Sequence, residues 1–130
     1  MHEALRQSLE PVLRDMGVSG IPVPVVSEDD WAGDPEIASA MLFSRDGSGV
    51  GVSVMASGAE TDRVARVADQ VQEWVIEQLW AQSSTNWPSC PSHPGNHPLS
   101  ASVIGRVAVW TCPSDGTVFC PVGALAVRKG

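Results

Sequence analysis

Three cysteines and two histidines lie between residues 90 and 120, and their spacing is typical of a metal site. Cys90 and His93 bound one short turn, and Cys112 and Asp115 bound a second turn of the same length. Residues 94–111 separate the two turns, a length within the range seen between the paired turns of zinc sites. Zinc prefers thiolate and imidazole ligands in a tetrahedral arrangement. The sequence therefore predicts a zinc ion held between the two turns.

His97 is our choice for the fourth ligand. It lies four residues after His93, in a loop that the intervening Pro-Gly pair can fold back on itself. Imidazole also suits a site that contains thiolates better than a lone carboxylate does. The predicted ligand set is therefore Cys90, His93, His97 and Cys112.

Asp115 and Cys120 are the first and second alternatives to His97. Asp115 ends the second turn, at a position where a ligand would fall. The placement of Cys120 depends on the hairpin that follows: a two-residue turn at Asp115-Gly116 directs its side chain away from Cys112, whereas a three-residue loop brings both to one face. If no metal binds, Pro-Ser-Asp-Gly is an ordinary turn sequence and the histidines are loop residues.

The segment from about residue 87 to residue 121 resembles a zinc ribbon. The resemblance rests on the two Cys-Pro-x-x turns, on the glycine after the second turn and on the hairpin that carries it. It implies four Cys or His ligands around one zinc ion in a structural site. Matched by position, the ligands would be Cys90, His93, Cys112 and the residue at position 115. The chain departs from the family there, because Asp115 stands where the family has cysteine or histidine.

The length and the charge of the chain restrict its class. The 130 residues fit one domain, 1–130, which includes the metal-binding loop and hairpin at 87–121. Fifteen acidic and eight basic residues give a net charge of −7, which argues against nucleic acid and membranes and favours a protein partner. The N-terminal residues do not form a secretory signal, and the cysteine pattern suits a reducing compartment, so we expect a cytoplasmic protein.

Two stretches have the apolar spacing of amphipathic helices. The first covers residues 3–16, where Pro11 predicts either a kink or a later start near Ser8. The second covers about residues 62–82, with Thr61 as the expected N-cap. Its stripe consists of Val64, Val67, Ala68, Val71, Trp74, Val75, Gln78 and Leu79.

The other segments predict strands. Residues 21–26 form a short strand that its two prolines confine to a sheet edge. Residues 37–45 and 49–56 form one hairpin, and residues 102–111 and 118–123 form another. The order α-β-β-β-α-β-β predicts an α+β fold: one antiparallel sheet of about five strands, two helices on one face and a zinc-ribbon-like hairpin at the C-terminal end.

The element order, acidity and size are also similar, loosely, to the small acidic chaperones of type III secretion systems and to YbjN-like proteins. That resemblance implies a homodimer that holds other polypeptides. Combined with a structural zinc site, it predicts a small zinc-stabilised accessory or protein-binding domain without catalytic activity.

A zinc hydrolase or lyase is the alternative function. Catalytic zinc keeps three protein ligands and an open position for water. Cys90, His93 and Cys112 would then be the ligands, with His97 or Asp115 as general base. The sequence contains no P-loop, no dinucleotide-binding fingerprint, no G-x-S-x-G and no H-E-x-x-H. The sequence therefore favours a protein that is not an enzyme.

Overall fold

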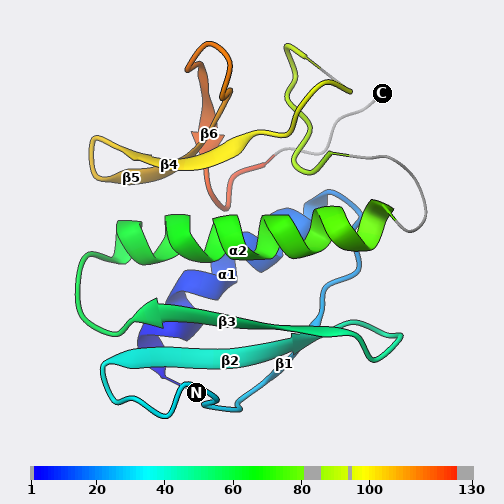
Figure 1. Ribbon diagram of the computed structural model, residues 1–130. Helices are drawn as coiled ribbons and strands as arrows, with labels where there is room; N and C mark the ends of the chain where they lie inside the picture. Colours follow the sequence, from blue (N-terminus) through cyan, green and yellow to red (C-terminus); the bar gives the residue numbers. More distant parts are fainter. Residues whose placement is uncertain (1, 81–85, 94, 126–130) are drawn as a thin grey trace.

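Two helices form a layer between two small sheets (Figure 1). The computed structural model describes residues 2–80, 86–93 and 95–125. Both sheets are antiparallel, with strand orders β1-β2-β3 in the first sheet and β4-β5-β6 in the second sheet. The elements are α1 (Glu3–Val18), β1 (Val25–Ser27), β2 (Ile37–Phe43), β3 (Gly49–Met55), α2 (Glu60–Trp80), β4 (Ser100–Ile104), β5 (Val107–Thr111) and β6 (Val118–Pro121).

The α+β class is confirmed, but the prediction of one sheet of about five strands is wrong. Residues 102–111 are not a single strand, because a two-residue turn at Gly105-Arg106 joins Ile104 to its partner Val107. Both turn residues have positive φ, 57° at Gly105 and 65° at Arg106, as a tight hairpin turn requires. The pair lacks the Asn-Gly or Asp-Gly signature, so the sequence pattern did not reveal it. The described chain therefore has six strands in two sheets.

Helix α2 keeps the two sheets apart because it is buried on two sides. Gln70 contacts the first sheet: its side-chain amide donates to Ser53 O at 2.8 Å and accepts from Ser53 N at 3.0 Å. Gln72 contacts the segments that flank the second sheet, donating to the carbonyl oxygens of Trp87 and Leu99. The predicted stripe lies between these contacts, and its buried members are Val64, Val67, Ala68, Val71, Trp74 and Val75.

The start of the first helix is confirmed, and the other helix ends differ from the predicted ones. Helix α1 begins at Glu3, as the apolar spacing over residues 3–16 predicts, and not at the alternative start near Ser8; Pro11 lies inside the helix, which extends to Val18. His2 caps this helix, since its Nδ1 accepts a hydrogen bond from Ala4 N at 3.1 Å. Thr61 is not the N-cap of α2, because the helix already begins at Glu60. Residues 81 and 82 of the predicted second helix lie outside the described residues.

The first sheet follows the predicted pattern with shorter strands. Strand β1 is an edge strand, as predicted, but it covers Val25–Ser27 instead of residues 21–26. Pro22 and Pro24 explain the difference, since neither has an N–H group to donate to a neighbouring strand. The hairpin of β2 and β3 is confirmed, and Ser44 N donates to Ser48 O across its turn at 2.8 Å.

A buried carboxylate attaches the second sheet to α1. Asp15 has no solvent exposure, although it is acidic. Its Oδ2 accepts hydrogen bonds from Trp110 Nε1 at 2.8 Å and from Gly123 N at 2.6 Å, and its Oδ1 accepts one from Leu125 N at 3.1 Å. A buried carboxylate is tolerated only when donors surround it. These three bonds therefore fix strand β5 and the segment after β6 on the helix.

Replacing Asp15 with alanine should lower the free energy of unfolding by about 3 kcal/mol or more, because three buried donors lose their acceptor. Asp15→Asn should be milder, since its amide oxygen still accepts. Urea denaturation followed by tryptophan fluorescence measures both. Glu10→Ala, an exposed position on the same helix, is the control and should stay within about 0.5 kcal/mol of the unmodified protein. An Asp15→Ala protein as stable as this control would contradict the role given to Asp15.

Candidate metal centre

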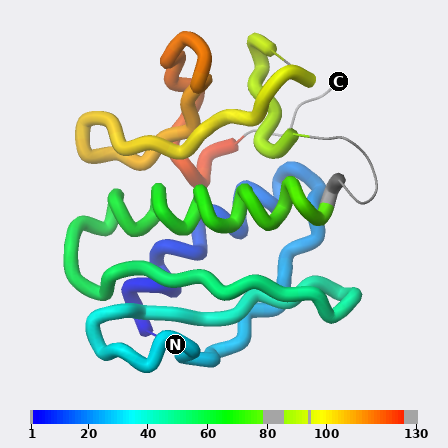
Figure 2. Tube along the Cα trace, in the orientation of Figure 1, coloured from blue at the N-terminus to red at the C-terminus, as the bar shows by residue number. Residues whose placement is uncertain are grey.

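The loop of residues 86–99 lies beside the turn between β5 and β6, as Figure 2 shows in yellow-green and orange. Cys90, His93 and His97 come from the loop, and Cys112 directly follows β5. The ligand atoms of these four residues all lie within 4.8 Å of one another. The structure therefore brings together a Cys₂His₂ group that could hold a metal ion. We call this group the Cys₂His₂ cluster.

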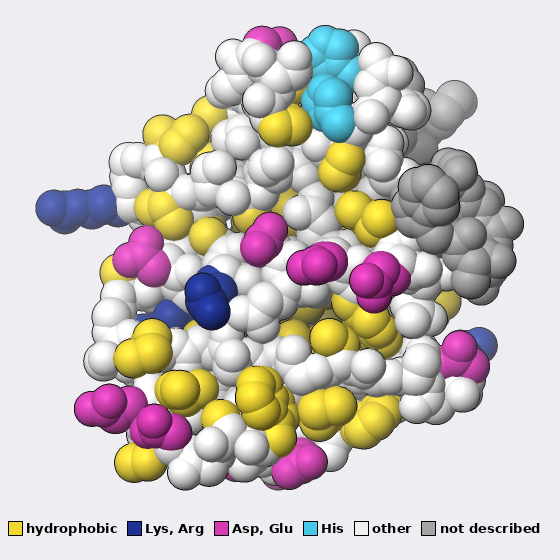
Figure 3. Space-filling model, in the orientation of Figure 1, with side chains coloured by type: hydrophobic (Ala, Val, Ile, Leu, Met, Phe, Trp, Pro, Cys, Tyr) yellow, Lys and Arg dark blue, Asp and Glu magenta, His cyan; other side chains and the backbone are white. Residues whose placement is uncertain are grey.

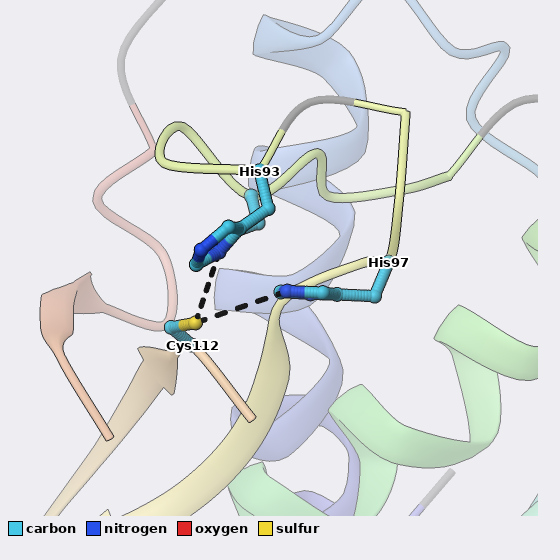
Figure 4. Close-up of side chains that lie close together, drawn as sticks. His93, His97 and Cys112 are labelled. Carbon is cyan, nitrogen blue, oxygen red and sulfur yellow. Dashed lines mark hydrogen bonds between the residues drawn. The ribbon is translucent and has the colours of Figure 1, made fainter. Parts of the chain in front are cut away.

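Three distances between sulfur and nitrogen atoms of the cluster are close to those of a tetrahedral zinc site. His93 Nδ1 lies 3.7 Å from Cys90 Sγ and 3.6 Å from Cys112 Sγ, and His97 Nε2 lies 3.9 Å from Cys112 Sγ. In Figure 4, both imidazole rings point toward the Cys112 sulfur. Zinc bonds of about 2.3 Å to sulfur and about 2.0–2.1 Å to nitrogen separate two tetrahedral ligands by about 3.6 Å. The side chains present thus fit an ion of this size.

The first turn builds half of the cluster locally. His93 N donates to Cys90 O at 3.1 Å, which closes a turn with both side chains at its ends. The base of the loop is closed as well: Ser89 pairs with Pro98, and Leu99 N donates to Pro88 O at 2.7 Å. The Cys-x-x-His spacing therefore determines a local structure, and the closed base holds the loop in place.

A hydrogen bond orients His97 within this loop. Its Nδ1 lies 3.1 Å from the carbonyl oxygen of Pro98. A carbonyl oxygen can only accept, so the proton is on Nδ1 and the lone pair of Nε2 is free to face Cys112. Histidines that bind metals commonly have their second ring nitrogen fixed in this way. His97 is thus prepared for ligation through Nε2.

The second turn holds Cys112 and engages Asp115 at the same time. Cys112 N donates to Thr117 O, and Gly116 N donates to Cys112 O, both at 2.8 Å. The exposed Asp115 carboxylate accepts from Thr117 N at 2.9 Å, and this bond is the main reason why the pKa of Asp115 falls to about 2. Asp115 therefore stabilises the turn, and it is not part of the Cys₂His₂ cluster.

Burial distinguishes the sulfur ligands from the nitrogen ligands. Cys90 and Cys112 are 0% and 1% exposed and belong to the apolar core, while both histidines are half-buried. Burial raises the pKa of the Cys112 thiol, and the N–H groups of Asp115 and Ser114, which favour the thiolate, offset part of this effect. The sulfurs thus lie on the core side of the cluster, and the imidazoles lie nearer the surface.

Two indole rings support the cluster from the core. Trp87 and Trp110 pack edge to face, with ring centroids 5.7 Å apart and planes at 72°. Each indole N–H is satisfied: Trp87 Nε1 donates to Ser19 Oγ at 3.0 Å, and Trp110 Nε1 donates to Asp15. Trp87 precedes Cys90 by three residues and Trp110 precedes Cys112 by two, so this ring pair connects the two turns. An apolar layer of this kind keeps water from the sulfur ligands.

Cys120 lies away from the Cys₂His₂ cluster. It pairs with Trp110 in the hairpin, whereas Thr111 pairs with Val118, so the register shifts between the two pairs. The hairpin therefore has neither the two-residue turn nor the three-residue loop that we considered from the sequence. Cys120 is half-buried, and burial together with the nearby Asp15 carboxylate raises the pKa of its thiol. Cys120 therefore belongs to the side of the hairpin that faces α1.

Sequence reasoning missed two residues that position the loop and the hairpin. Gln72 donates from Nε2 to Trp87 O at 3.2 Å and also to Leu99 O, so one side chain of α2 holds both ends of the loop. Asp15 fixes Trp110 in the same way on the hairpin side. The only signal in the sequence is that each is a polar residue next to the apolar stripe of its helix.

Changes within the Cys₂His₂ cluster should remove bound metal, and changes at the two alternatives should not. We expect Cys90→Ser, Cys112→Ser and His97→Ala to lower the metal content at least tenfold, as loss of one ligand weakens the site. Asp115→Ala and Cys120→Ser are the matched controls and should retain it. Elemental analysis after gel filtration measures the content. Metal retained in His97→Ala but lost in Asp115→Ala or Cys120→Ser would reassign the fourth ligand.

Comparisons with known proteins show no family for this chain. No family model matches it, and neither a curated protein nor a solved structure matches it. Among the described residues, no helix is long and apolar enough to cross a membrane. Metal binding at the Cys₂His₂ cluster and the resemblance to a zinc ribbon stay predictions that rest on the residues themselves.

Proposed function

We propose that one zinc ion binds Cys90, His93, His97 and Cys112 in a closed structural site. The observation that carries this proposal is the convergence of four ligand atoms within 4.8 Å. Magnesium and calcium prefer oxygen ligands, and two thiolates with two imidazoles suit zinc. The zinc-ribbon-like pattern of residues 87–121 agrees with the same ion.

The ion would join two parts of the chain that are distant in sequence. Three ligands come from the loop of residues 86–99, and the fourth comes from the turn after β5. Apart from the bridge between Ser89 and Pro98, no strand or helix is formed by the described residues of this loop before β4. Free energy of metal binding at such a site adds to the free energy of folding. Zinc would therefore act here in place of regular secondary structure.

A non-catalytic role follows from the number of ligands. Four protein ligands complete a tetrahedral zinc ion, so no position is left for the water that a hydrolase or lyase activates. Asp115, one candidate general base, already accepts a hydrogen bond from Thr117 N. We therefore propose a small accessory domain that binds another protein, with zinc as a structural component. Thiolate ligands must stay reduced, which agrees with the cytoplasmic location expected from the sequence.

Protein purified after growth with zinc should contain about one equivalent of zinc, and its X-ray absorption spectrum should show two sulfur and two nitrogen ligands. A zinc content below about a tenth of an equivalent after such growth would contradict the proposal, because structural sites of this type bind zinc tightly. A spectrum with three protein ligands and one water oxygen would instead favour the hydrolase or lyase.

Removal of zinc should lower the melting temperature of the protein, because the ion stabilises the folded state. A strong chelator and the Cys90→Ser variant should have similar effects, and the chelator should not destabilise Cys90→Ser further. Thermal unfolding followed by circular dichroism measures both. Cys120→Ser is the control, since it changes a thiol outside the cluster. A melting temperature that the chelator leaves unchanged would show that the ion is not structural.

A further inference from the structure

A groove follows the open edge of the first sheet, between β3 and α2. Its volume is about 430 Å³. Val50, Gly51 and Ser53 of β3 line one side, and Asp69, Glu73 and Glu77 of α2 line the other. It lies apart from the Cys₂His₂ cluster, because none of the residues that line it belongs to that cluster. We call this feature the β3 groove.

The backbone of β3 presents hydrogen-bonding groups to this groove. Among the described strands, β3 pairs with β2 alone. The N–H and C=O groups of Ser53 point away from β2, since both bond to the side chain of Gln70. Residues two apart in an antiparallel strand point their backbone groups the same way, so the groups of Gly51 face the groove as well. An open edge of this kind can accept an added strand.

The side chain of Gln70 occupies the backbone hydrogen-bonding groups of this edge at Ser53. Its side-chain amide both donates to and accepts from Ser53, as the backbone of an added strand would do. The amide is attached to a flexible side chain that is not fully buried, so a peptide can displace it. The edge at Ser53 is therefore covered by a side chain and not by a strand.

The carboxylates on α2 define the chemistry of the partner. Asp69, Glu73 and Glu77 follow at intervals of four, which places them in a row about 6 Å apart along the helix. Figure 3 shows acidic side chains in a row across this face, above apolar side chains of the sheet. Within the described residues no ion pair engages these three carboxylates, and Arg66 is the one basic residue in the lining.

The spacing of the three carboxylates along α2 is close to the spacing of alternate side chains along a β-strand. Alternate side chains of an extended peptide lie on one face, about 6.6–6.8 Å apart. Three alternate basic side chains can therefore each reach one carboxylate. The intervening side chains would extend the outer face of the first sheet, where the large exposed apolar residues include Val25, Trp31, Phe43 and Met55. Apolar residues suit those positions.

We propose that the β3 groove binds an extended segment of a partner protein in which lysine or arginine alternates with apolar residues, and that this segment adds to β3 as a further strand. The inference rests on the proposed protein-binding function and gives the partner its chemistry. The net charge of −7 would attract such a segment from a distance.

The probe is a fluorescein-labelled peptide, Thr-Lys-Val-Lys-Val-Lys-Thr, added to the zinc-loaded protein and followed by fluorescence anisotropy. A peptide of the same composition with its three lysines adjacent should bind at least tenfold more weakly. Two further peptides carry backbone N-methyl groups on the lysines or on the valines. Because N–H groups alternate between the two edges of a strand, one methylated peptide should bind and the other should not.

Protein variants separate the groove from the overall charge. Glu73→Gln should weaken binding about two- to fivefold, the range for one exposed ion pair, and neutralising Asp69, Glu73 and Glu77 together should weaken it at least tenfold. Glu10→Gln changes the net charge equally outside the groove and should have no effect beyond about 1.5-fold. Gln70→Ala should strengthen binding, because it frees the backbone groups of Ser53. Circular dichroism verifies that each variant is folded.

Several results would overturn this inference. The first is that the peptide with adjacent lysines binds as tightly as the alternating peptide, and the second is that neutralising Asp69, Glu73 and Glu77 together leaves binding unchanged. The third is a dimer that persists in sedimentation experiments with excess peptide, which would assign the edge of β3 to a second copy of the chain. Zinc is measured in every sample. If the zinc-loaded protein does not bind the peptide, the inference about the β3 groove is wrong and the metal proposal stands. If protein purified after growth with zinc contains no zinc but binds the peptide, the metal proposal is wrong and the inference about the β3 groove stands.

Discussion

The buried carboxylate of Asp15 is the interaction on which the second half of the structure depends. It is the point on α1 to which Trp110, Gly123 and Leu125 are all bonded. Since Trp110 precedes Cys112 by two residues and packs against Trp87, the carboxylate also determines where both turns of the cluster lie. A buried charge with three donors has one favourable arrangement, because displacement of the strand would leave both the charge and its donors unsatisfied.

The Cys₂His₂ cluster combines local and tertiary structure. Cys90 and His93 are brought together by a turn of their own segment, closed by the bond from His93 N to Cys90 O. Cys112 joins them only because the hairpin is attached to α1 and the loop is attached to α2 through Gln72. The thiols lie in the core and the imidazoles lie near the surface, so one side of the cluster is dry while the other stays accessible to an incoming ion.

The helix layer separates the Cys₂His₂ cluster from the β3 groove. Helix α2 carries Gln72 toward the loop of the second sheet and Gln70, two residues earlier, toward the edge of β3. The Cys₂His₂ cluster and the β3 groove therefore lie in different parts of the fold, and helix α2 contacts both parts. In the proposed function, zinc would stabilise the domain at one end and a partner would bind at the other. The acidic row on α2 is part of the groove because the helix flanks the edge strand and does not cover it.

The sequence by itself determined the features that depend on neighbouring residues. It predicted two amphipathic helices, the hairpin of β2 and β3, the edge position of β1 and the four residues that the fold brings together, because apolar periodicity, turn residues and Cys-x-x-His spacing are local. Only the tertiary structure decided that the helices separate two sheets, that Gly105-Arg106 divides one predicted strand, and that Cys120 faces Asp15 instead of Cys112. The separation of the sheets depends on a helix that is buried on two sides and on the hydrogen bonds of the buried Asp15, which join residues far apart in the chain. The turn at Gly105-Arg106 and the shifted register of β5 and β6 are local, but neither has a residue signature that the sequence pattern reveals.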